Sequence, residues 1–425
     1  MKPVTRLLYV ITSTLVLAAC ASPPANPAPS PEPTTVVQAI NPQSTAAPKP
    51  TIAAPGLLLS RPQGERGPLV AFDMATGSQR FTLPAGVLAA NGQAYFAAGI
   101  DGADTLLGGY DLGSGAALDP IRLPGNWSLS AVSPTGRWTA LTQIITAEEQ
   151  KGWTAATEWH TPLQIVDTTG RLTPQSIDLP GNFAVDALSS RGDSLYVIEY
   201  LPAQKPDHYQ VRLYDLAAHA LVDGALVDKR EPDEVMWGER WDALGSRDGR
   251  WQLTLYLRPD EGIAFIHALD LDNRYTLCYD LPGQSADLDS LKYYSLALAP
   301  GGHTLYAANP VLGKVARVDL DDFAVSTVAT FEAVTPGVVP AITTSRGVMS
   351  RDGRAMYFTD GAQAWAFDTQ KQTVSLLAQA AGGTGLDLSP DGTRLYLASQ
   401  DQSLVMLDTA SGQPLSFTAA SAAGQ

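Results

Sequence analysis

The chain has 425 residues, of which 45% are hydrophobic, and its 28 Lys and Arg against 43 Asp and Glu give a formal net charge of −15. A chain this acidic lacks the basic surface that neutralises nucleic-acid phosphates or adheres to anionic lipid by charge, so we expect no nucleic-acid partner. Its 37 glycines and 31 prolines favour many short strands joined by turns.

The first residues are typical of a signal peptide. Lys2 and Arg6 supply a basic start, and residues 7–19 are apolar apart from three hydroxyl residues. This run is shorter than the ~20 residues that span a bilayer as a helix, but it suits the core of a signal peptide. Residues 1–19 are therefore predicted to be absent from the mature protein.

The signal segment ends in Leu17-Ala18-Ala19-Cys20, which resembles the lipobox of bacterial lipoproteins. The resemblance implies a lipid on the thiol of Cys20 that anchors the protein to a membrane. The alternative is an ordinary secretory signal with a chance cysteine. Because Ala21 follows the cysteine, where an Asp often marks retention in the inner membrane, the resemblance implies the outer membrane, facing the periplasm, of a two-membrane cell. In a single-membrane cell it implies the outer face of the plasma membrane.

Residues 20–55 comprise this cysteine and a linker rich in Pro, Ala, Ser and Thr. The linker has too few large apolar side chains to offset the entropy lost on ordering. Its prolines favour an extended chain, so we expect a semi-rigid spacer between the membrane and the folded part.

From residue 56 the chain repeats two features. One is a hairpin turn before an apolar strand, found at Ala90–Gln93, Ser133–Gly136, Ser190–Asp193, Ser246–Gly249, Ala299–Gly302, Ser350–Gly353 and Ser389–Gly392. The other is an apolar strand that ends in an aspartate before a turn, found at Asp73, Asp111, Asp167, Asp215, Asp270, Asp319, Asp368 and Asp408. An aspartate in this position can accept hydrogen bonds from the backbone N–H groups of its turn.

Four antiparallel strands per unit of about 48 residues predict the blades of an all-β propeller. The repeats, best preserved at Ser389–Ser399 and Val405–Gly412, resemble the YVTN-type and WD-like repeats of bacterial propellers. The resemblance covers residues 56–418 and leaves 419–425 as a tail. Eight aspartate-ended strands favour eight blades, the first of them degenerate, with an inner strand supplied by either terminus. Seven blades, with residues 57–83 displaced, is the alternative.

Three long segments interrupt the repeat, at Gln143–Thr161, Tyr200–Tyr209 and Asp228–Trp241. They belong to the third to fifth blades, so we expect them to lie side by side on the face opposite the hairpin turns. Trp, Tyr and Arg dominate binding hot spots, which makes this face a candidate recognition surface. Alternatively, the tryptophans pack their own loops and the charges solvate them. The candidate residues for a partner or ligand are Trp153, Trp159, His160, His208, Trp237, Arg240 and Trp241.

No spacing in the chain predicts catalytic residues, a metal site or a cofactor, and the five histidines are scattered. Cys278 lies in a strand-like run and is predicted to be a small core residue. These observations favour a lipid-anchored, non-enzymatic binding or scaffold protein of the cell envelope with a protein or glycan partner. The alternatives are an enzyme of the central channel, either a lactonase-like hydrolase or a quinone-dependent dehydrogenase, and a glycan sensor that uses the tryptophans.

Overall fold

The computed structural model describes residues 56–61, 67–150, 153, 158–283, 286–335, 347–379, 383–399 and 403–417. The predicted signal peptide, Cys20, the linker before residue 56 and the predicted tail all lie outside these ranges. Two helices of four residues each, α1 (Ala147–Gln150) and α2 (Leu288–Leu291), accompany the strands. Within the described ranges, no helix is long and apolar enough to cross a membrane.

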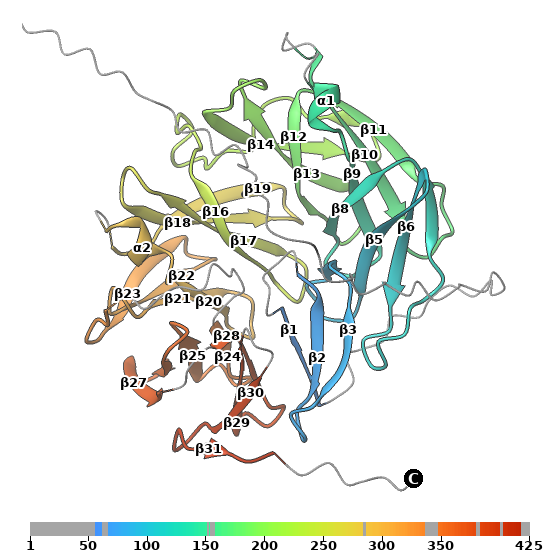
Figure 1. The fold of residues 1–425 in the computed structure, drawn as a ribbon. Coiled ribbons are helices and arrows are strands. Elements are labelled where there is room, and N and C mark those ends of the chain that lie inside the picture. Colours follow the sequence, from blue (N-terminus) through green and yellow to red (C-terminus); the bar gives the residue numbers. More distant parts are fainter. Residues whose placement is uncertain are drawn as a thin grey trace, which may run out of the picture. The chain divides into compact units, whose positions relative to one another are not determined.

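The strands form eight antiparallel sheets arranged as the blades of a ring (Figure 1), so the predicted eight-bladed propeller is confirmed. Blade 1 contains β1 (Leu57–Ser60), β2 (Leu69–Asp73) and β3 (Gln79–Leu83), and blade 2 contains β4 (Val87–Leu88), β5 (Tyr95–Asp101), β6 (Asp104–Tyr110) and β7 (Ile121–Pro124). Blade 3 contains β8 (Trp127–Val132), β9 (Trp138–Gln143), β10 (His160–Asp167) and β11 (Gln175–Pro180). Blade 4 contains β12 (Asn182–Leu188), β13 (Ser194–Leu201), β14 (His208–Asp215) and β15 (Ala220–Leu221).

Blade 5 contains β16 (Glu239–Gly245), β17 (Trp251–Arg258), β18 (Ile263–Asp270) and β19 (Tyr275–Asp280), and blade 6 contains β20 (Ser295–Leu298), β21 (Thr304–Asn309), β22 (Lys314–Asp319) and β23 (Ala324–Thr330). Blade 7 contains β24 (Gly347–Met349), β25 (Ala355–Thr359), β26 (Ala364–Asp368) and β27 (Thr373–Ala378). Blade 8 contains β28 (Gly383–Leu388), β29 (Arg394–Ser399), β30 (Leu404–Asp408) and β31 (Pro414–Leu415). In each four-stranded blade the strands pair in chain order, with the first innermost.

Blade 1 has three strands among the described residues. Strand β2 ends at Asp73, as the third strand of every other blade ends at its turn aspartate or, in blade 2, one residue before it. Strands β1 to β3 therefore correspond to the second to fourth strands of the other blades. The predictions that blade 1 is degenerate and that a terminus supplies its inner strand concern residues outside the described ranges.

The turn aspartates have the structural role that the sequence predicts. The Oδ1 atom of Asp73 accepts hydrogen bonds from the backbone N–H groups of Ala75 and Thr76, at 2.9 and 3.0 Å, and these bonds lower the pKa of its carboxyl group. In the hairpin turn of blade 8, the hydroxyl groups of Ser389 and Thr393 and a backbone N–H bond to Asp391 and lower its pKa to about 2. Asp391 is therefore a turn residue.

Two hairpin turns lie one residue earlier than the sequence pattern suggests. In blade 2 the N–H of Gly92 bonds to the carbonyl of Ala89, and in blade 4 the N–H of Gly192 bonds to the carbonyl of Ser189. Asn91 and Arg191 are thus the third residues of their turns. The glycine, which has a positive φ in both turns, comes fourth, as it does in the other five.

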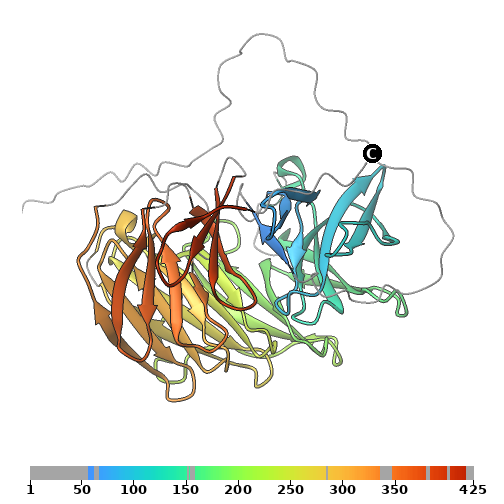
Figure 2. The ribbon, with the colours of Figure 1, turned by 90° about the horizontal axis from the view of Figure 1, so that it is seen from below.

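The hydrophobic core lies between neighbouring blades. One large cluster joins Trp251 and Leu255 of blade 5 to Leu296 and Leu305 of blade 6. Another joins blade 1 to blade 8, around Phe72 and the residues Leu58, Val70, Met74, Tyr396, Ala398 and Met406. Blade 8 accordingly stands beside blade 1 in the view from below (Figure 2). Side-chain packing between the first and last blades therefore closes the ring.

Candidate functional site

The three long loops leave blades 3, 4 and 5 at the end of the strands opposite the hairpin turns. They are residues 144–159 between β9 and β10, residues 202–207 between β13 and β14, and residues 222–238 between β15 and β16. Since antiparallel strands alternate in direction, all three emerge at the same end of their blades. Their side chains nevertheless form separate groups.

In blade 3 the structure brings three predicted site residues together. The ring centroid of Trp153 lies 5.5 Å from that of Trp159, at an interplanar angle of 72°, and 4.8 Å from that of His160. His160 in turn places Nδ1 3.1 Å from a carboxylate oxygen of Asp178. The two indoles cover one another edge to face, so this group packs the loop onto its own blade.

The predicted site residues of blades 4 and 5 each contact a different partner. His208 pairs with its neighbour Asp207, with 2.5 Å between Nδ1 and Oδ1. The Nε1–H of Trp241 donates to the carbonyl of Lys292 at 3.1 Å, and its indole packs against the core shared by blades 5 and 6. Trp237 has the guanidinium of Arg258 over its ring at 5.6 Å.

Arg240 is exposed and acts electrostatically on Asp186 of blade 4. Burial raises the pKa of the Asp186 carboxyl to about 6, and the positive charge of Arg240 opposes that rise. Asp186 lies at a bulge of β12, between the paired residues Val185 and Ala187. This pair links the inner strands of blades 4 and 5.

The loop of residues 222–238 crosses from blade 4 to the outer edge of blade 5. It leaves β14 after Leu226, which bridges Val211, and returns at Met236, which bridges Tyr209. Between these two bridges, the carboxylate of Asp228 accepts from the backbone N–H of Cys278 at 2.9 Å.

Arg230 adds further hydrogen bonds between this loop and blades 5 and 6. Its guanidinium donates to the carbonyl of Cys278 at 2.7 Å, to the carbonyl of Phe323 in blade 6 at 3.1 Å, and to the carboxylate of Asp228 at 2.6 Å. Cys278 lies on β19, the outermost strand of blade 5, whose edge groups would otherwise be unpaired. Part of the segment Asp228–Trp241, which the sequence suggested for recognition, therefore covers a strand edge.

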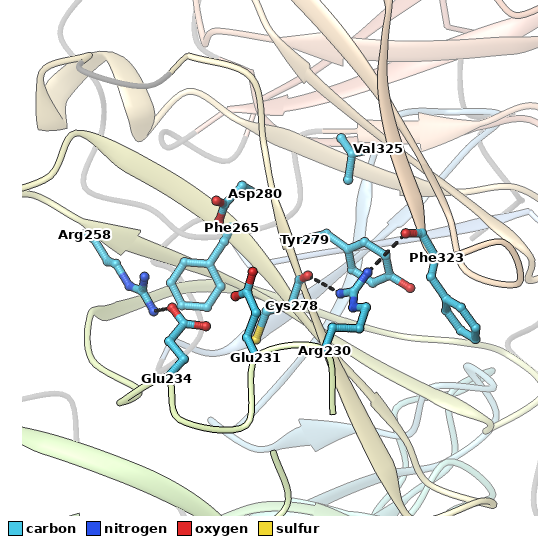
Figure 3. Close-up of a pocket in the computed structure, with 10 residues that line it drawn as sticks. All are labelled: Arg230, Glu231, Glu234, Arg258, Phe265, Cys278, Tyr279, Asp280, Phe323 and Val325. Atoms are coloured by element: carbon cyan, nitrogen blue, oxygen red, sulfur yellow. Dashed lines mark hydrogen bonds and ion pairs between the residues drawn. The ribbon is translucent and has the colours of Figure 1, made fainter. Parts of the chain in front are cut away.

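The loop of residues 222–238 covers a cleft of about 240 Å³ between the outer strands of blades 5 and 6 (Figure 3). We call this cleft the rim cleft. It is lined by Arg230, Glu231, Glu234, Arg258, Phe265, Cys278, Tyr279, Asp280, Phe323 and Val325. Arg258 is buried; its Nη2 lies 2.6 Å from Oε1 of Glu234, and its guanidinium stacks 4.6 Å from the ring centroid of Phe265. Both arginines of the cleft are thus bound to carboxylates of the same loop.

The rim cleft carries more negative than positive charge. The neighbouring carboxylate of Glu234 raises the pKa of Glu231. Burial raises the pKa of Asp280, with Glu234 and Glu261 adding to the rise and Arg258 opposing it. The raised pKa values show that the ionised carboxylates of Glu231 and Asp280 are destabilised in the cleft. These carboxylates would therefore attract a cation placed beside them.

The thiol of Cys278 lines the cleft but is not prepared for nucleophilic chemistry. Burial raises its pKa to about 12, and the carboxylates of Glu234 and Asp228 contribute to that rise. The reactive species of a cysteine is the thiolate, which is scarce under these conditions. In the part of the chain that the structure describes, no group of three or more His, Cys, Asp and Glu is arranged to hold a metal ion.

Phe323 is the feature of the cleft that sequence reasoning missed. It is the fourth residue after Asp319 and has a φ of 56°, in the left-handed region that bulky side chains rarely adopt. The same position after the other turn aspartates, except in blade 3, holds Gly77, Gly115, His219, Arg274, Gln372 and Gly412, all with positive φ. Aligning the eight turns would have singled out this aromatic residue, which is 44% exposed.

No protein-family model matches the chain, and no curated protein matches it. Among solved structures, apo AztD from Citrobacter koseri superimposes with a TM-score of 0.50 at 12% identity, covering 85% of this chain and 93% of that one. Dihydro-heme d1 dehydrogenase NirN in complex with DHE gives 0.49 at 15% identity, over 88% and 75% of the two chains. A putative 6-phosphogluconolactonase from Bacteroides uniformis gives 0.39 at 14% identity, over 76% and 94%. At this level of identity, the likeness to AztD shows the β-propeller fold alone.

Proposed function

We propose that the protein is a lipid-anchored binding protein of the cell envelope, and that its rim cleft holds a basic segment of a partner protein. The lipobox resemblance at Leu17–Cys20 and the proline-rich linker up to residue 55 support the anchor. By the same resemblance we propose that the propeller lies at the outer membrane, facing the periplasm, of a two-membrane cell, or at the outer face of the plasma membrane of a single-membrane cell.

Phe323 is the single observation that carries the proposal of a binding site. The turn itself imposes the left-handed φ, since six equivalent positions share it, but those positions hold glycine or the polar residues His219, Arg274 and Gln372. A bulky aromatic residue there costs of order 1–3 kcal/mol of backbone strain. Here the strained residue is also exposed, so the propeller gains little burial from it. An exposed aromatic ring beside a charged cleft has the character of a protein-binding hot spot.

The charge of the rim cleft indicates what kind of partner it would take. Arg230 and Arg258 are already bound to Asp228 and Glu234, whereas the carboxyl groups of Glu231 and Asp280 have raised pKa values. A Lys or Arg side chain from a partner would relieve the repulsion among these carboxyl groups while apolar groups packed on Phe323. A basic, partly apolar peptide segment fits both features.

The alternative functions draw less support from the same structure. A glycan sensor needs open indole faces, but Trp153 and Trp159 cover one another and Arg258 lies over Trp237. A central-channel enzyme needs converging acids, histidines or a cofactor cradle, and most residues that line the central opening are small or aliphatic.

The anchor is tested by a Cys20→Ala variant expressed in the native cell. We expect the parent protein in the membrane fraction and the variant in the soluble extracytoplasmic fraction, because one cysteine carries the lipid. A variant that remains in the membrane fraction after a high-salt wash would contradict the proposed anchor.

The rim cleft is tested by replacing Phe323 with the photo-crosslinker p-benzoylphenylalanine, which keeps an aromatic ring at that position. The control carries the same crosslinker at Leu172, which is 53% exposed in the turn between β10 and β11 of blade 3. We expect a discrete, salt-sensitive adduct with one envelope protein at position 323 and none at position 172. Equal labelling at both positions would remove the proposal.

A further inference from the structure

A second cavity, separate from the rim cleft, lies at the centre of the ring. This central cavity has a volume of about 840 Å³. Its walls come from the inner strands of blades 2, 5, 6, 7 and 8, and from Gly56, Leu57 and Met74 of blade 1. A volume of this size lies within the range of about 300–1,000 Å³ found for small-molecule sites.

Contacts across the ring set the position of the central cavity. On one side, blade 5 reaches across to blade 2, so closely that a Cβ atom on Gly245 would lie 2.7 Å from the Cβ of Ala90. On the other side, Gly56, Leu57 and Met74 of blade 1 line the cavity opposite blade 5. Among the described residues, the cavity therefore lies between blade 1 and blades 5 to 8.

The body of the central cavity is apolar and its polar groups gather at the hairpin turns. Its aliphatic lining is made of Leu57, Met74, Leu88, Leu244, Leu296, Leu298, Val348, Met349 and Leu388. Its charged residues are Arg247 and Asp248 in the turn of blade 5, Arg351 in the turn of blade 7, and Asp387 at the end of β28. A ligand of this cavity would therefore need a long apolar part and one polar end.

Arg247 and Arg351 hold the same position in their turns, the second residue after the preceding strand. The other five turns have Ala90, Pro134, Ser190, Pro300 and Pro390 at this position. Turn geometry favours proline there, so arginine is not required by the fold. The only arginines at this position are thus the two that line the central cavity.

The two guanidinium groups have no hydrogen bond or close ion pair with any residue that the structure describes. The nearby carboxylate of Asp248 is engaged in its own turn, where it accepts from Ser246 and from the backbone N–H of Arg250. Both arginines act electrostatically on Asp387. Burial raises the pKa of its carboxyl group, and the positive charges of Arg247 and Arg351 oppose this rise. The arginine pair therefore has free donors for an anion.

We propose that the central cavity binds an organic acid, with its carboxylate held by Arg247 and Arg351 and its apolar body lying between blades 5 to 8. Arginine donates two parallel hydrogen bonds to a carboxylate, which gives both charge and direction to the contact. The apolar walls contribute by burying the hydrocarbon part. Asp387, as a carboxyl group close to the ligand's head, competes for the same arginines.

The test uses octanoate as the probe and 1-octanol as its uncharged counterpart, titrated into the purified full chain in a calorimeter. We expect octanoate to bind with a stoichiometry of one, and the double variant Arg247→Ala, Arg351→Ala to lose at least tenfold in affinity. The double variant should bind octanol as the parent does. Asp387→Asn should bind octanoate more tightly, because it removes the competing charge.

Arg191→Ala is the matched control, since Arg191 is an exposed arginine of the neighbouring turn that pairs with Asp193 and lies outside the central cavity. Its affinity for octanoate should equal that of the parent. The proposal is overturned if octanoate fails to bind, if the double variant binds it equally well, or if inorganic phosphate competes as strongly as octanoate does. The last result would indicate a simple anion site without an apolar part.

Discussion

The hydroxyl group of Tyr396 in blade 8 donates a hydrogen bond of 3.0 Å to the backbone carbonyl of Met74 in blade 1. Blades 4 and 5 show the same contact, in which Tyr196 donates to the carbonyl of Leu271 at 2.9 Å. In both cases the acceptor directly follows the turn aspartate of the next blade. The last and first blades therefore meet as two consecutive blades do, although no strand is exchanged between them in the described ranges.

Removal of this hydroxyl should loosen the closure of the ring. We expect Tyr396→Phe to lower the free energy of unfolding by about 1–2 kcal/mol, because the buried carbonyl of Met74 loses its donor. Amide exchange in β1 and β2 should also become faster. Tyr196→Phe is the control: it should cost a similar free energy without faster exchange in blade 1. Unchanged exchange in blade 1 of the Tyr396 variant would show that other contacts close the ring.

The turn glycines of blade 8 allow strain and packing to be separated. Gly392 and Gly412 have φ values of 73° and 70°, so alanine is disfavoured by the backbone at both. A Cβ atom would meet nothing within 4 Å at Gly392, but at Gly412 it would lie 1.8 Å from the carbonyl oxygen of Leu377 in blade 7. We expect denaturant unfolding to show a loss of about 1–2 kcal/mol for Gly392→Ala and about 3 kcal/mol or more for Gly412→Ala. Equal losses would place blades 7 and 8 further apart.

The eight-bladed fold was predictable because its signals are local. Each turn aspartate and each hairpin glycine acts within a few residues, so spacing alone yields the blade count. The exact position of two hairpin turns could not be predicted from the sequence. Asn91-Gly92 and Arg191-Gly192 fit either the middle or the end of a turn. The choice depends on which backbone groups pair across the hairpin.

The sites were less predictable because they depend on contacts between distant blades. The segment Asp228–Trp241 was identified as unusual from the sequence, but its contact with the edge of β19 rests on pairing between Asp228 and Cys278. The tryptophans looked alike in sequence, and the structure gives Trp241 a core contact and Trp153 an aromatic neighbour. Their predicted role in recognition stays a prediction.

Asp228 should protect the thiol of Cys278. In the parent protein the thiol has a pKa of about 12 and lies beneath the loop, so we expect slow labelling by a thiol reagent under native conditions. Asp228→Ala leaves the N–H of Cys278 without its acceptor and the exposed Arg230 without its ion pair, at a cost of about 1–3 kcal/mol. Labelling of Cys278 should accelerate at least tenfold, as followed by mass spectrometry. A labelling rate equal to the parent's would show that the loop stays in place without this carboxylate.

His267 should make stability depend on pH. It is buried, and burial lowers its pKa to about 4, against about 6.5 in the unfolded chain. The unfolded state thus takes up a proton first as pH falls below 6.5, and the folded state loses stability by about 2 kcal/mol between pH 7 and pH 5. His267→Gln should lack this dependence. Because Asp186, with its raised pKa, acts in the opposite direction, the difference between parent and variant is the quantity to measure. A difference that is constant with pH would contradict the buried, neutral histidine.

The most direct test of the account measures whether the charge of the rim cleft holds the partner. The protein carrying p-benzoylphenylalanine at position 323 is irradiated in cells, alone and combined with Glu231→Gln and Asp280→Asn, which keep the size of both side chains. If the cleft binds a basic segment, the adduct yield falls at least tenfold in the combined variant, and added salt lowers the yield of the parent in the same direction. An adduct that forms equally well without these two carboxylates, and at any salt concentration, would contradict the proposed function.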